Sequence, residues 1–161
     1  VRVAAYAGVT DCRAAALIEG LERACPYGCL GLGSCVTACA FDAMRVEDGL
    51  GVIDEDACTS CGACVKVCPQ HVLRLQALSR PILVSCSSTD KGATAKKACK
   101  VACIGCKRCV KACDDDAITV KSFLASIDPD KCTACRKCVG ECPTGSILDL
   151  HRNEGGADGS A

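Results

Sequence analysis

The feature that most constrains this 161-residue chain is a set of cysteines that occurs twice with the same spacing. Nine of its 19 cysteines recur after a constant offset of 74 positions, as from Cys12 to Cys86. The two matched sets are Cys12, Cys25, Cys29, Cys35, Cys39, Cys58, Cys61, Cys64 and Cys68, and Cys86, Cys99, Cys103, Cys109, Cys113, Cys132, Cys135, Cys138 and Cys142. Cys106 stands outside the pattern, because Leu32 occupies its counterpart. Glycines, valines, aspartates and prolines follow the same offset, which indicates a duplicated fold.

The composition leaves little bulk for a hydrophobic core. The chain has no Trp, two Phe, two Tyr and one Met, and cysteine itself inflates its hydrophobic fraction of 50%. Each repeat of about 70 residues lies near the lower limit for an independent core. Domains of this size usually depend on metal sites or disulfides, and a high cysteine content is typical of both. Bound metal centres are therefore expected to supply the missing crosslinks.

The local spacing of the cysteines distinguishes between kinds of crosslink. Tight C-x2-C steps favour metal centres over disulfides, which would join distant loops. Zinc ribbons also contain C-x2-C pairs, but they place two such pairs on either side of a spacer. Residues 58–69 instead read C-x2-C-x2-C-x3-C-P, the complete run of bacterial ferredoxins, and residues 132–143 repeat it. We therefore predict [4Fe-4S] clusters, with a zinc-stabilised assembly scaffold as the alternative from another class.

The ferredoxin run also predicts which cysteines share a cluster. Its first three cysteines bind one cluster, whereas the fourth enters a helix that leads to the neighbouring cluster. In the first repeat, the expected ligand sets are Cys39 with Cys58, Cys61 and Cys64, and Cys68 with Cys25, Cys29 and Cys35. In the second repeat, they are Cys113 with Cys132, Cys135 and Cys138, and Cys142 with Cys103, Cys106 and Cys109. Sixteen cysteines thus predict four [4Fe-4S] clusters.

Two of the four motifs are irregular. Because Leu32 occupies the middle of the first motif, another thiol must complete its ligand set; Cys25 is the nearest in sequence, and Cys12 is the fallback. In the second repeat Cys99 competes with Cys106, and we expect Cys106 to bind because its spacing is standard. Three thiols are then spare, either as buried free cysteines or as alternative ligands. They are Cys12, Cys86 and Cys99.

The segments between the cysteines predict an α+β fold, a tandem duplication of bacterial-type 2[4Fe-4S] ferredoxin-like domains. Hairpins are expected within 43–54 and 117–128, and outer strands at 72–75 and 147–150. A helix is expected over 13–24, with one apolar face made of Ala14, Leu17, Ile18 and Leu21. The predicted organisation is a helical lead-in at 1–24, a first domain at 25–80, a linker with a short strand at 81–98, a second domain at 99–150 and a disordered tail at 151–161.

Three segments resemble a particular family. They are Cys-Pro-Tyr-Gly-Cys-Leu-Gly-Leu-Gly-Ser-Cys at 25–35, Ala-Cys-Ile-Gly-Cys-Lys-Arg-Cys at 102–109 and Val-Thr-Asp-Cys-Arg-Ala-Ala-Ala at 9–16. Together with the two C-P motifs, they resemble the B subunit of the Rnf complex over about residues 6–150.

The resemblance implies a function and a setting. The Rnf complex is a membrane-bound, ion-translocating ferredoxin:NAD oxidoreductase, whose B subunit takes electrons from soluble ferredoxin and passes them on. We therefore expect an electron-transfer subunit without a catalytic site of its own, on the cytoplasmic side of the cell membrane and in contact with other subunits. Family members also carry an N-terminal membrane helix and a further cluster domain, which we expect to precede Val1 in the full protein.

Charge and hydropathy argue against other functions. A net charge of zero and an aromatic content of 2% speak against nucleic-acid binding. No apolar run approaches the ~18 residues of a membrane span, and neither His71 nor His151 has a visible catalytic partner. Seven basic residues between 91 and 111, followed by three aspartates, form either a solvated face or a docking patch for an acidic partner such as ferredoxin. A polyferredoxin subunit of a hydrogenase, carbon monoxide dehydrogenase or heterodisulfide reductase is the alternative within the same class.

Overall fold

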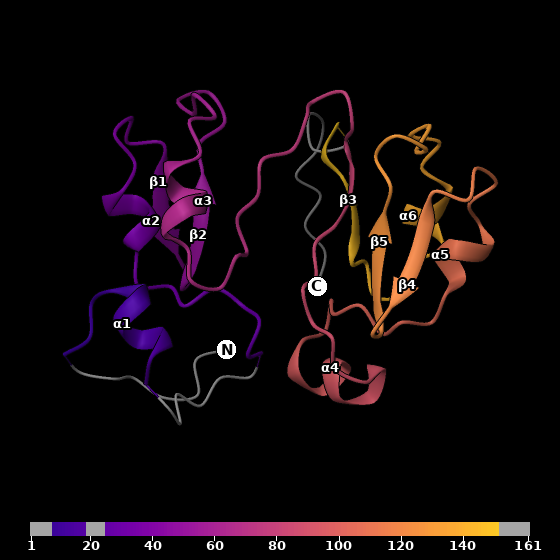
Figure 1. Ribbon diagram of the computed structural model, residues 1–161, viewed down its shortest axis with the longest axis horizontal. Coiled ribbons are helices and arrows are strands. Elements are labelled where there is room, and N and C mark those ends of the chain that lie inside the picture. The colour runs from indigo at the N-terminus through magenta and orange to yellow at the C-terminus, as the bar shows by residue number, and fades with distance from the viewer. Residues whose placement is uncertain (1–7, 19–24, 152–161) are drawn as a thin grey trace. The chain divides into compact units, whose positions relative to one another are not determined.

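The computed structural model describes residues 8–18 and 25–151, and the chain divides into two units, Val1–Leu75 and Gln76–Ala161 (Figure 1). The first unit contains α1 (Cys12–Ala16), α2 (Ser34–Thr37), β1 (Met44–Glu47), β2 (Leu50–Ile53) and α3 (Ala63–Val67). The second contains β3 (Ile82–Val84), α4 (Gly92–Ala98), α5 (Arg108–Lys111), β4 (Ile118–Lys121), β5 (Leu124–Ile127), α6 (Lys137–Gly140) and β6 (Ile147–Asp149). Both units thus contain short helices together with antiparallel strands, which agrees with the predicted α+β class.

Both predicted hairpins are confirmed. β1 pairs with β2 in antiparallel register, with Met44 opposite Ile53, and β4 pairs with β5, with Ile118 opposite Ile127. The first hairpin turns at Asp48 and Gly49, which have φ values of 48° and 78°. Two successive residues with positive φ are typical of the tight turn that matches the natural twist of a hairpin.

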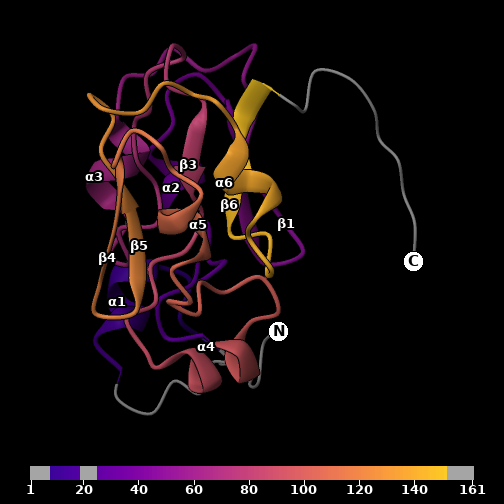
Figure 2. The ribbon, with the colours of Figure 1, turned by 90° about the vertical axis from the view of Figure 1, so that its right-hand side faces the viewer.

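The second unit also contains a strand pair that joins its two ends. β3 pairs with β6 in antiparallel register, with Val84 opposite Ile147 (Figure 2). The strand predicted near the start of 81–98 is present as β3. Because β3 pairs with β6 and α4 follows it in the same unit, this segment is part of the second unit.

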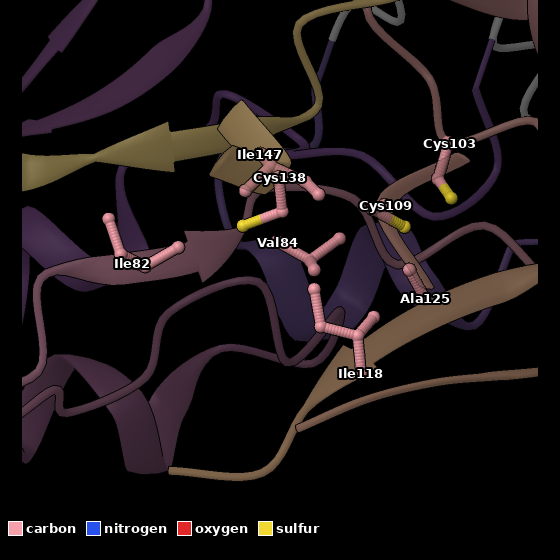
Figure 3. Close-up of a cluster of buried hydrophobic side chains, with 8 residues drawn as sticks. All are labelled: Ile82, Val84, Cys103, Cys109, Ile118, Ala125, Cys138 and Ile147. Carbon is pink, nitrogen blue, oxygen red and sulfur yellow. The ribbon is translucent and has the colours of Figure 1, made fainter. Parts of the chain in front are cut away.

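The core of the second unit lies between this strand pair and the β4–β5 hairpin. It combines five aliphatic residues with three cysteines (Figure 3). Its members are Ile82, Val84, Ile118, Ala125 and Ile147, together with Cys103, Cys109 and Cys138. The candidate ligands are therefore part of the core itself, as the scarcity of bulky side chains suggested.

The first unit lacks an equivalent strand pair among its described residues. The outer strand predicted at 72–75 is wrong, since these residues adopt no regular structure. By the 74-residue offset, the counterpart of β3 is the segment Gly8-Val9-Thr10, where the second unit has Ile82-Leu83-Val84. Gly8 has a φ of 111°, and glycine is a poor strand former. Residues 72–75 consequently have no partner strand there.

The predicted helix over 13–24 is only partly borne out. α1 runs from Cys12 to Ala16, and residues 19–24 of the prediction lie outside the described residues. The expected apolar face is wrong where it can be examined, because Leu17 is 85% exposed whereas Cys12 and Ala15 are buried against Leu30. The expected tail lies outside the described residues from 152 onward.

Candidate iron-sulfur centres

The four cysteine motifs share one backbone conformation. The third cysteine of each motif is the second residue of a short helix, in α2, α3, α5 and α6. Each helix has an N-cap with positive φ: Gly33 (81°), Gly62 (75°), Lys107 (60°) and Arg136 (65°). A second residue, four positions before the third cysteine, also has positive φ: Gly31 (68°), Ser60 (56°), Gly105 (64°) and Ala134 (55°). The irregular first motif is thus folded like the other three.

This conformation suits an anionic cluster. Residues that alternate between right- and left-handed conformations turn successive backbone N–H groups toward one concave face, as in many iron-sulfur sites. In the first motif, the Gly31 N–H donates to the sulfur of Cys29 over 3.4 Å. In the second unit, the Ala117 N–H donates to the sulfur of Cys113 over 3.4 Å. Hydrogen bonds of this kind to the sulfurs of an iron-sulfur cluster influence its reduction potential.

One predicted ligand set surrounds a small cavity in the second unit. Four cysteines line this cavity, together with Ile82, Ile118 and Arg136. They are Cys113, Cys132, Cys135 and Cys138. The pKa of Cys138 is raised to about 11, mainly by burial and further by the neighbouring thiols of Cys132 and Cys135. The cavity therefore takes three thiols from one motif and the fourth from the other, which is the crossover arrangement that the sequence predicts.

The other set of the second unit is also brought together. Burial raises the pKa of Cys109, and the nearby thiols of Cys103, Cys106 and Cys142 raise it further. Burial acts in the same direction on Cys142, but hydrogen bonds with Ser146 and Thr144 outweigh it and lower the pKa of Cys142 to about 7. The sulfurs of Cys103 and Cys109 lie together in Figure 3, whereas that of Cys138 points the other way. The core cysteines thus face two separate sites.

The first unit gathers its thiols in a similar way. Burial and the thiols of Cys58 and Cys61 raise the pKa of Cys64. α2, which is followed by Cys39, packs against α3, which carries Cys64 and is followed by Cys68. This helix pair matches α5 with α6 in the second unit, so the same crossover is available to Cys39 and Cys68.

The first motif shows one feature that the predicted ligand set did not include. Burial is the main cause that raises the pKa of Cys35. The nearby thiol of Cys29 raises this pKa further, and the thiol of Cys12 adds a smaller contribution. Cys25, the ligand expected from its place in the sequence, forms a turn in which the Gly28 N–H donates to the Cys25 carbonyl over 3.2 Å.

The chemistry of the gathered thiols fits a [4Fe-4S] cluster. Mutual repulsion of the thiolates opposes their ionisation, and a bound iron-sulfur core would remove that penalty because its irons are positively charged. In a zinc site, all the thiolates lie about 2.3 Å from one ion. A cluster instead spreads its four thiolates over separate irons and, when bound, carries single electrons.

Comparisons with known proteins support the same assignment. Residues 102–146 match the 4Fe-4S dicluster domain, and residues 52–74 match the 4Fe-4S binding domain. Both matches confirm tandem ferredoxin-type domains with [4Fe-4S] clusters. Within residues 8–18 and 25–151, no helix has the length and apolar character needed to cross a membrane.

Three relatives match most of the chain. It is 48% identical over 143 residues to the B subunit of the ion-translocating oxidoreductase complex of Methanosarcina acetivorans, a match that covers 88% of this chain and 54% of that protein. It is 47% identical over 145 residues to the B subunit of the Na⁺-translocating ferredoxin:NAD⁺ oxidoreductase complex of Acetobacterium woodii, covering 89% and 44%. It is also 47% identical over 145 residues to the B subunit of the proton-translocating complex of Clostridium ljungdahlii, covering 88% and 51%.

The chain spans about half the length of these curated relatives. The three matches extend over nearly nine-tenths of the chain. With its tandem ferredoxin-type domains and this level of identity, the chain belongs to the family of B subunits of Rnf-type ion-translocating oxidoreductase complexes.

Proposed function

We propose that this chain relays electrons through four [4Fe-4S] clusters within an Rnf-type ferredoxin:NAD oxidoreductase. The observation that carries the proposal is the cavity lined by one complete crossover set of cysteines, from Cys113 to Cys138. Each short helix holds the third ligand of one cluster and is followed by the fourth ligand of the next. The two clusters of a unit therefore share a pair of packed helices, and this keeps them close enough to exchange electrons.

The proposed ligands are the cysteines of the four motifs. Three sets are complete within the motifs: Cys39 with Cys58, Cys61 and Cys64; Cys113 with Cys132, Cys135 and Cys138; and Cys142 with Cys103, Cys106 and Cys109. The fourth set contains Cys29, Cys35 and Cys68 and needs one further thiol, from Cys25 or Cys12. Cys86 and Cys99 remain outside all four sets.

The proposed electron donor is soluble ferredoxin, and the proposed acceptor is another subunit of the complex on the cytoplasmic side of the membrane. The relatives' names support a ferredoxin-linked complex. Support within this chain comes from the charge around Cys106, an exposed cysteine that is followed directly by Lys107 and Arg108. A cationic surface beside an exposed cluster would accelerate encounter with an acidic electron carrier.

The test is to count the clusters and then reduce them. Anaerobically reconstituted chain should contain about 16 iron and about 16 sulfide, as four clusters with four cysteines each require. Reduced ferredoxin should bleach the cluster absorption within the mixing time of a stopped-flow experiment. Saturation with zinc would contradict the cluster assignment. A complete set of clusters that ferredoxin cannot reduce would contradict only the proposed donor.

A further inference from the structure

We infer that Cys12 supplies the fourth ligand of the first cluster, in place of the thiol that Leu32 replaces. The complete set would be Cys12, Cys29, Cys35 and Cys68. This inference rests on the proposed function, because it concerns a ligand of one of the four proposed clusters. It gives α1 a role in cluster binding, because Cys12 belongs to this helix and lies outside the ferredoxin motif.

The loop around Leu32 has the backbone conformation of a complete cysteine motif, although Leu32 stands where the ligand cysteine would be. The residues on either side of Leu32, Gly31 and Gly33, have φ values of 68° and 81°. In the second unit, Gly105 and Lys107 flank Cys106 with φ values of 64° and 60°. The backbone path of a complete motif is therefore retained, and the cluster position beside Leu32 needs a thiol from elsewhere.

Cys12 lies beside this position. It is 8% exposed and forms a buried group with Ala15 and Leu30, against which the side chain of Leu32 packs. The thiol of Cys12 is also near enough to Cys35 to contribute to the raised pKa of that ligand, after burial and Cys29. Cys12 therefore belongs to the buried group against which Leu32 packs, and its thiol lies near that of Cys35, the third cysteine of the same motif.

A hydrogen-bond network fixes Cys12 relative to the motif. The Cys12 N–H donates to the Ser34 hydroxyl over 2.7 Å, and Ser34 directly precedes Cys35 in α2. The Ser34 hydroxyl in turn donates to Asp11 over 3.1 Å. Asp11 is the N-cap of α1 and accepts from the Arg13 N–H over 2.8 Å. The start of α1 is thus tied to the residue beside the third ligand, and such anchoring positions a ligand for binding.

The second unit contains the natural comparison. Cys86 is the counterpart of Cys12, and its sulfur accepts a hydrogen bond from the Ser88 N–H over 3.4 Å. Cys106 already completes the ligand set there. A thiol at this position is consequently needed in the first unit and dispensable in the second.

The decisive experiment compares iron content and electron paramagnetic resonance of anaerobically reconstituted variants. Cys12→Ala should lower the iron content from about 16 per chain to about 12, or to about 15 if a three-iron cluster remains, since one cluster of four irons is affected. Cys25→Ala and Cys86→Ala should keep the full content. The double variant Cys12→Ala/Leu32→Cys should restore the missing irons, because it rebuilds the standard spacing.

The outcomes separate this inference from the proposed function. Loss of a cluster in Cys25→Ala but not in Cys12→Ala would overturn the inference in favour of Cys25. Loss in Cys12→Ala that Leu32→Cys does not restore would also overturn it, because Cys12 would then act only in packing. If the unaltered chain itself does not approach 16 iron, the proposed four-cluster function fails instead.

Discussion

Replacing Gly31 by alanine should damage the first cluster loop more than replacing its neighbour Gly33. Gly31 has a φ of 68°, and a Cβ atom there would lie 2.3 Å from the Gly49 carbonyl oxygen and 2.8 Å from the Gly49 carbonyl carbon, in the β1–β2 turn. A left-handed conformation costs a non-glycine residue about 1–2 kcal/mol. The overlap with the turn adds about 1–3 kcal/mol, as overpacking of a tight site does. The total is therefore about 2–5 kcal/mol.

Gly33 is the matched control because it has the conformation without the crowding. Its φ is 81°, and a Cβ atom there would come no closer than 3.7 Å to a side-chain carbon of Val46. Gly33→Ala should therefore cost only about 1–2 kcal/mol. The difference of about 1–3 kcal/mol corresponds to a factor of about 5–150, since 1.4 kcal/mol is a factor of ten.

The assay is the rate of cluster loss on anaerobic heating, because cluster breakdown is irreversible and its stability is best expressed as a rate. Absorption of the clusters is followed in parallel for the parent chain and both variants. Gly31→Ala should lose the first cluster faster than Gly33→Ala by up to the factor given above. If both variants lose clusters at the same rate, the close approach of the loop to the β1–β2 turn is not what requires glycine at position 31.

Two further perturbations test other parts of the structure. Arg136 pairs with the carboxylate of Asp149 over 2.6 Å, and the Asp149 side chain is 2% exposed. Arg136 itself is 59% exposed, so Arg136→Gln should destabilise the second unit by about 1–3 kcal/mol, the cost of removing one partner of a buried acceptor. Asp149→Asn in the same chain should recover part of the loss. Thermal melting of the parent, both single variants and the double variant measures the coupling, and purely additive effects would contradict it. Removal of the clusters by a chelator should abolish cooperative unfolding of both units, because metal-binding free energy is folding free energy in such domains. Hydrogen exchange should show earlier loss of protection in the first unit, whereas cooperative unfolding of the cluster-free chain would show that the aliphatic core suffices.

The hairpins could be predicted because their information is local. A turn of Asp48-Gly49 between short β-forming segments specifies a hairpin without reference to distant residues. The crossover ligand sets stay a prediction, which rests on the spacing of the ferredoxin run because this spacing reflects the size of the cluster that it encloses. In the second unit, the cavity from Cys113 to Cys138 has the predicted lining.

Long-range pairing and non-glycine strain could not be predicted in the same way. The run Ile82-Leu83-Val84 indicates a strand, but nothing in it identifies β6 as its partner. Lys107 and Arg136 adopt positive φ, which sequence rules assign to glycine and only occasionally to other residues. The signal that could have found them is the alignment of the two repeats at the 74-residue offset, which places Lys107 and Arg136 where Gly33 and Gly62 stand in the first unit.

The two units are duplicated in sequence, but different segments bury their cores and complete their cysteine motifs. In the second unit, β3 closes the core against β6, and Cys106 completes the cysteine motif. In the first unit, Gly8 begins the segment that corresponds to β3, and no strand forms there among the described residues. The burial that a strand would provide comes instead from α1, through Cys12 and Ala15. A single short helix would thus compensate for both differences, because it packs against the irregular loop and brings a thiol to the position where that loop has none.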